Sequence, residues 1–157
     1  MIRIIIENDI FVSDKGSDLV NTIFYIDYQG KYFPDNQWTD FADVVLQWWT
    51  HALIKNKDLC DINFILYFMD GPFRLEVHKG DRMDLTINCI NDRTTAFSEL
   101  TIECSYIEFM SALYDAFKSF SFILYCNEMH KGRFEPVYRQ SLITMNEIKE
   151  VLASLKT

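Results

Sequence analysis

The sequence DINFILYFMDGPFRLEVHK, residues 61–79, decides the fold, because apolar and polar residues alternate on both sides of an Asp70-Gly71 pair. A period of two is typical of a half-buried strand, and Asp-Gly between two such runs predicts a β-hairpin. Pairing Phe68 with Phe73 places all the apolar residues on one face of the hairpin. In this register Leu66 lies opposite Leu75, and Phe64 lies opposite Val77.

Two further runs extend this hairpin into a four-strand meander. A loop at residues 80–82 allows Val77 to face Leu85 and Ile87 to face Leu75. The fourth strand alternates in the same way, with Leu100, Ile102 and Cys104 inward and Glu99, Thr101 and Glu103 outward. A slip of one residue would bury carboxylates, so we expect a firm register.

The rest of the chain adds two strands and three helices. We expect strands at residues 2–6 and 21–28, a polar loop at 8–18 and a short return pairing at 32–33. Thr39 is the expected N-cap of a first helix with the apolar stripe Phe41, Val45, Trp48 and Ala52. Capping boxes at residues 105–108 and 144–147 predict two more helices, and residues 131–141 form a polar connection between them.

These elements predict an α+β fold with the order β-β-α-β-β-β-β-α-α. Its sheet is mostly antiparallel, includes the four-strand meander, and has three helices packed on one face, because cleanly alternating strands have one covered and one wet face. No linker or repeat divides the sequence, and we expect one domain over residues 1–157.

Charge and cysteine usage limit the classes of function. The net charge is −8, and residues 1–100 hold 9 basic and 16 acidic side chains, which gives 9 − 16 = −7. Such a field disfavours nucleic acid and anionic membrane; it serves solubility or attracts a basic protein. The four cysteines are scattered through apolar runs, which favours reduced thiols and a cytoplasmic location.

No recognised catalytic or cofactor motif is present, so we expect no catalytic residues, no metal and no cofactor. His78 is the residue with the clearest chemical alternative. In the expected register it faces Asp84 on the wet side of the sheet, with Glu103 beside them, and this row could bind a cation or perform acid–base chemistry. The competing interpretation is an ordinary cross-strand ladder of charges.

Residues 30–49, GKYFPDNQWTDFADVVLQWW, and residues 68–73, FMDGPF, resemble a group of small uncharacterised bacterial proteins. Members of that group are similar to immunity proteins of bacterial toxin systems. The resemblance implies a non-catalytic protein that neutralises a toxin by occluding its active site, and it brings no catalytic residues. A small enzyme or ligand-binding domain that uses the sheet face near His78 is the alternative, and a self-associating structural subunit is a third possibility.

The predicted partner-binding surface surrounds the start of the first helix. It combines acidic side chains with a tryptophan, a residue common in binding hot spots, and it comprises Asp14, Asp18, Asp35, Trp38, Asp40 and Asp43. Asp40 and Asp43 have a competing local role, because carboxylates in a first turn stabilise a helix. The tryptophans could equally serve core packing.

Overall fold

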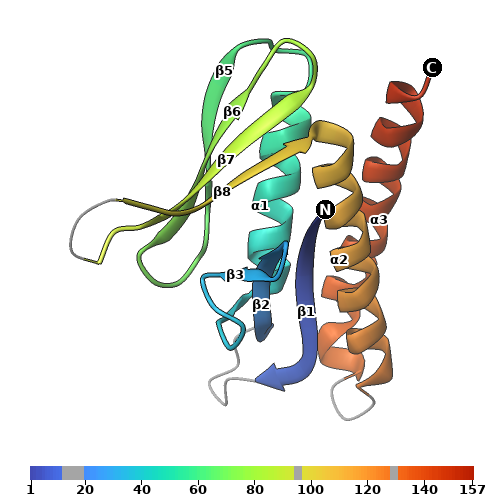
Figure 1. Cartoon of the computed structure of the whole chain (residues 1–157). Coiled ribbons are helices and arrows are strands. Elements are labelled where there is room, and N and C mark those ends of the chain that lie inside the picture. Colours follow the sequence, from blue (N-terminus) through green and yellow to red (C-terminus); the bar gives the residue numbers. More distant parts are fainter. Residues whose placement is uncertain (12–19, 94–96, 128–130) are drawn as a thin grey trace.

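A computed structural model describes residues 1–11, 20–93, 97–127 and 131–157. It confirms the α+β class and the predicted element order; the short return pairing predicted at residues 32–33 is a strand, and one further short strand, at residues 39–41, precedes the first helix (Figure 1). The strands are β1 (Ile2–Phe11), β2 (Asn21–Tyr28), β3 (Lys31–Phe33), β4 (Thr39–Phe41), β5 (Ile62–Tyr67), β6 (Phe73–Lys79), β7 (Asp84–Asn91) and β8 (Phe97–Ser105). The helices are α1 (Ala42–Lys55), α2 (Tyr106–Cys126) and α3 (Lys131–Leu155).

The described strands form two antiparallel sheets. In the first, β2 lies between β1 and β3 and also pairs with β4. The second is the predicted meander, in the order β5-β6-β7-β8. β1 and β5 therefore each lie at one edge of a sheet within the described part of the chain.

The register of the meander is as predicted in its first hairpin and shifted in its second. Leu66 pairs with Leu75, and Phe64 pairs with Val77. Val77, however, pairs with Ile87 where Leu85 was expected. A shift of two residues keeps every side chain on its face, so hydrophobic alternation cannot detect it. The turn between β6 and β7 selects the register, because the Gly80 amide donates to the Asp84 carbonyl at 3.0 Å.

The first helix begins later than expected and faces the core with a different stripe. Thr39 belongs to β4, and Phe41 occupies the N-cap without a side-chain hydrogen bond. The buried apolar stripe of α1 consists of Ala42, Val45, Leu46, Trp49 and Leu53. Trp49 enters the core, whereas Trp48, one residue earlier and about 100° around the helix, remains exposed.

The two C-terminal helices meet one prediction and contradict another. Ser105 and Glu108 form the predicted capping box of α2. The capping box predicted at Thr144 does not exist, because α3 is continuous from Lys131 and includes the expected polar connection. Thr144 is buried inside this helix, where it donates to the Gln140 carbonyl at 3.1 Å and accepts from Gln47 of α1 at 2.8 Å.

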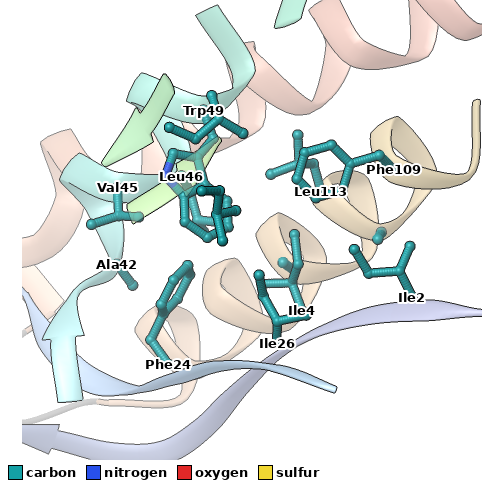
Figure 2. Packing of buried hydrophobic residues seen from close by; sticks show 14 of the residues in the cluster. Ile2, Ile4, Phe24, Ile26, Ala42, Val45, Leu46, Trp49, Phe109 and Leu113 are labelled. Atoms are coloured by element: carbon teal, nitrogen blue, oxygen red, sulfur yellow. The ribbon is translucent and has the colours of Figure 1, made fainter. Parts of the chain in front are cut away.

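The core lies between the sheets and the first two helices. Figure 2 shows Ile4 and Ile26 of the first sheet close to Leu113 of α2, with Trp49 of α1 above them. α3 packs against α2 and α1, so the third helix covers helices where a sheet face was predicted (Figure 1). Among the described residues, no helix has the length and hydrophobicity that a membrane crossing requires.

Candidate protein-binding surface

The structure separates the residues of the predicted acidic surface. Asp35 is exposed, Asp43 is half-buried, and Asp40 is only 1% exposed. The remaining two, Asp14 and Asp18, lie outside the described residues. The expected cluster of accessible carboxylates at the start of α1 is therefore wrong for Asp40.

Asp40 is an internal hydrogen-bond acceptor. Its Oδ1 accepts from the Phe41 amide at 2.8 Å, and its Oδ2 accepts from Trp38 Nε1 and the Asp70 amide, each at 3.3 Å. Burial raises the pKa of the Asp40 carboxyl above its usual value, and these three hydrogen bonds oppose the rise. The side chain thus connects β4 to the turn between β5 and β6.

Asp43 and Trp38 also have structural contacts. Asp43 Oδ1 accepts from the Val20 amide at 3.2 Å, which ties the first turn of α1 to the start of β2. Burial raises the pKa of the Asp43 carboxyl. The half-buried Trp38 ring packs edge-on against Phe73, with 4.8 Å between ring centroids. Among the described members of the predicted site, only Asp35 is exposed.

A different part of the surface collects large exposed side chains. Trp48 of α1 is 48% exposed, and Ile65 and Tyr67 of β5 are 41% and 53% exposed. These three residues, called the β5–α1 patch below, line one hollow of about 260 Å³ together with the exposed His51. Aromatic and aliphatic groups in contact with solvent at one place are typical of interaction sites.

Two structural features hold the β5–α1 patch in place. The buried Trp49 donates from Nε1 to the Tyr67 carbonyl at 2.8 Å and so ties α1 to β5. Period-two alternation then directs Ile65 and Tyr67 away from the core while Leu66 points into it. The signal was available in the sequence, because two large apolar residues occupy outward positions of a strand. The inward-facing apolar residues alone fix the register of the hairpin, so the outward-facing pair does not enter that prediction.

A second hollow, of about 340 Å³, lies on the wet face of β5 and β6 beside His78. His78 Nδ1 lies 2.9 Å from Asn63 Oδ1, and Nε2 lies 3.4 Å from Asp61 Oδ1. The predicted row with Asp84 and Glu103 is wrong. The two-residue shift pairs His78 with Thr86.

Metal binding has no support in the described ranges. Asp84 pairs with Ser105, and Glu103 with Thr86, so neither carboxylate is opposite His78. Across the residues that the structure describes, no group of three or more His, Cys, Asp or Glu side chains could hold a metal ion.

Comparison of the chain with protein-family models, with curated proteins and with solved structures finds no match. The fold, the exposed apolar groups and the charges are therefore the observations that bear on function.

Proposed function

We propose that the protein is a non-catalytic, cytoplasmic protein-binding domain whose partner docks on the β5–α1 patch. The observation that carries this proposal is the solvent exposure of Trp48, Ile65 and Tyr67 around a single hollow. Tryptophan and tyrosine are the residues most enriched among binding hot spots, because they bury a large area at a small cost in conformational entropy.

The charges around the patch favour a basic partner. Exposed Asp61 precedes β5, and exposed Asp70 follows it three residues after its end. Arg74, which lies opposite Tyr67, is ion-paired with Glu76 and Asp92. The net charge of the whole chain is −8. A field of this sign accelerates encounter with a basic protein and leaves the apolar patch to supply the affinity.

In this proposal the protein acts by occluding the active site of its partner. A basic toxin domain covered by the patch loses access to its substrate, which is the role that the resemblance of residues 30–49 and 68–73 to immunity-like proteins suggests. All four cysteines are described and are free thiols, which is in keeping with a reducing compartment.

Site-specific crosslinking in the producing cells tests the proposal. A photoreactive amino acid replaces Tyr67 in one sample and Phe122 in another; Phe122 is an exposed aromatic residue of α2, outside the patch. A basic protein is expected to crosslink from position 67 and not from position 122. The affinity of the captured protein is then measured with Trp48→Ala and with Phe122→Ala as the matched control.

The expected result is a roughly 30-fold loss of affinity for Trp48→Ala, since a hot-spot residue contributes about 2 kcal/mol or more. Phe122→Ala should bind like the wild type. Equal affinity of both variants, or crosslinking that does not distinguish the two positions, would rule out the β5–α1 patch.

The hollow beside His78 supports a second candidate, a site for a small polar ligand. It is lined by groups that can donate or accept hydrogen bonds, including Asn63, Glu76 and Asn88. His78→Ala separates the two functions, because it removes the ligand site and leaves Trp48 and Tyr67 intact. Unchanged partner binding with lost ligand binding would assign the hollow its own role.

A further inference from the structure

A third concave region lies between β1 and α2, which run side by side (Figure 1). Its volume is about 370 Å³, within the usual range of ligand sites. One wall is the chain from Met1 to Ile5, and the other is the flank of α2 from Ile107 to Ser119. We call it the β1–α2 groove.

The edge of β1 that faces away from β2 has open hydrogen-bonding groups. The Phe24 amide donates to the Trp38 carbonyl at 2.9 Å, so the backbone groups of Phe24 point away from β1. The pair of Ile6 and Phe24 is thus a non-hydrogen-bonded pair of the β1–β2 ladder. Because the pattern alternates, the N–H and C=O groups of Ile2, Ile4 and Ile6 point to the outer edge.

These three residues span roughly 13 Å at about 3.3 Å per residue, enough to pair with a short strand. Within the described residues, no backbone hydrogen bond connects this part of β1 to anything except β2. The edge of β5 differs, because the Tyr67 carbonyl already accepts from Trp49. An incoming strand therefore finds more open partners on β1.

The α2 wall carries two apolar side chains, two serines and two carboxylates, and its small side chains allow close approach. Ala112 is buried and Ile107 half-buried, and the small side chains of Ser111 and Ser119 leave space above the helix. A strand added beside β1 would direct alternate side chains into this space. Apolar side chains suit those positions.

The charges that line the groove are unbalanced. Arg3 is ion-paired with Asp27 of β2 and has its positive charge compensated. Glu108 and Asp115, both exposed, also line the groove. The positive charge of the Met1 amino group acts on Glu108, which also accepts from the Ser105 amide. Asp115, in contrast, has no cationic partner among the described ion pairs. A lysine or arginine side chain therefore complements Asp115.

We propose that the β1–α2 groove binds an extended peptide segment of a partner protein, which pairs with the outer edge of β1 as an added strand. Alternate apolar side chains of the peptide pack against Ile107 and Ala112, and a basic side chain contacts Asp115. This mode of recognition takes affinity from main-chain hydrogen bonds and specificity from alternate side-chain positions. The proposal involves different residues from the β5–α1 patch and does not rest on it.

The probe is a phage-displayed library of random octapeptides, selected on the purified full chain. We expect enriched peptides with alternating apolar residues and at least one Lys or Arg. One enriched peptide is synthesised, and its affinity is measured by fluorescence anisotropy. Amide hydrogen exchange should show new protection at Ile2, Ile4 and Ile6 in the complex.

Two variants have matched controls on α3. Ser111→Trp fills the groove and should weaken peptide binding at least 10-fold, whereas Ser154→Trp, the same change at an exposed position, should not. Asp115→Lys should weaken it more than Glu150→Lys, which changes the net charge equally. Trp48→Ala should leave peptide binding unchanged, so this test is independent of the one for the β5–α1 patch.

Each of three outcomes would overturn the proposal. The first is that no peptide is enriched on the wild type over Ser111→Trp. The second is that peptides bind without protecting the three β1 amides. The third is a concentration-dependent dimer with the same amides protected and no peptide present, which would assign the edge to pairing between two copies of the chain.

Discussion

Replacement of Asp40 by alanine tests whether this buried carboxylate organises the loops beside the core. The change removes the acceptor for the Phe41 amide, the Trp38 indole N–H and the Asp70 amide. A buried donor left without a partner costs about 1–3 kcal/mol. Trp38 is half-buried and Asp70 exposed, so water can replace part of what their groups lose.

Relief of the cost of burying the carboxylate offsets part of this loss, since burial raises the Asp40 pKa. We therefore expect Asp40→Ala to lower the free energy of unfolding by about 2 kcal/mol, which corresponds to about 4–8 °C in Tm for a chain of this size. Urea unfolding followed by tryptophan fluorescence measures the change. Asp35→Ala is the control, because that side chain is exposed and should change stability by less than about 0.5 kcal/mol.

The pH dependence separates the charge of Asp40 from its shape. A raised native pKa means that the unfolded carboxyl, with a pKa near ~3.9, loses its proton first as the pH rises. The corresponding stabilisation is complete below the unfolded pKa and is lost as the pH rises through the native pKa. Asp40→Asn cannot titrate, so the stability advantage of the wild type over this variant should narrow as the pH rises from below the unfolded pKa to above the raised native pKa.

Two results would refute this account of Asp40. A loss below about 0.5 kcal/mol for Asp40→Ala would mean that the three donors find other acceptors at no cost. An advantage over Asp40→Asn that widens with pH would mean that the native state favours the ionised carboxylate.

Two further predictions concern the cysteines and the turn between β5 and β6. Two of the thiols, Cys60 and Cys126, are exposed, whereas Cys89 is buried and Cys104 is half-buried. Burial raises the pKa of the Cys89 and Cys104 thiols to about 12. A thiol reagent at pH 8 should therefore label two cysteines quickly and all four only after denaturation. Rapid labelling of all four in the native protein would contradict this. Gly71→Ala should be the more destabilising of two glycine substitutions at positive φ, because its Cβ would lie 2.6 Å from Trp38, whereas a Cβ at Gly30 meets nothing within 4 Å. Equal Tm losses for the two variants would contradict the contact with Trp38.

The first hairpin of the meander could be derived from residues 61–79 because alternation ties each residue to one face. Pairing of Leu66 with Leu75 follows from that pattern and is confirmed. The pairing of Val77 could not be derived, because a two-residue shift preserves every face and only the geometry of the turn selects the register. The expected contact of His78 with Asp84 was wrong for this reason.

The helices show the same division. Ser105 and Glu108 form a local motif, and the predicted helix start is correct. Thr144 and Glu147 have the same spacing, yet no cap forms, because Thr144 finds its partners in Gln140 and in Gln47, which lies 97 residues away. Thr144 is a polar residue on the buried face of α3. A search for apolar periodicity therefore does not show that the helix continues through this position.

The sequence by itself determined the α+β class, the order of the elements and the faces of the strands in the meander, because these depend on interactions between residues close in the chain or on a period of two. Tertiary structure alone decided which polar groups are accessible. It buried Asp40 against the β5–β6 turn, exposed Trp48 while burying Trp49, and placed α2 beside the open edge of β1. The candidate sites therefore depend on contacts between segments that are distant in the sequence. Which side chains such contacts bury is decided by the packing of the whole fold, and no local sequence pattern specifies it.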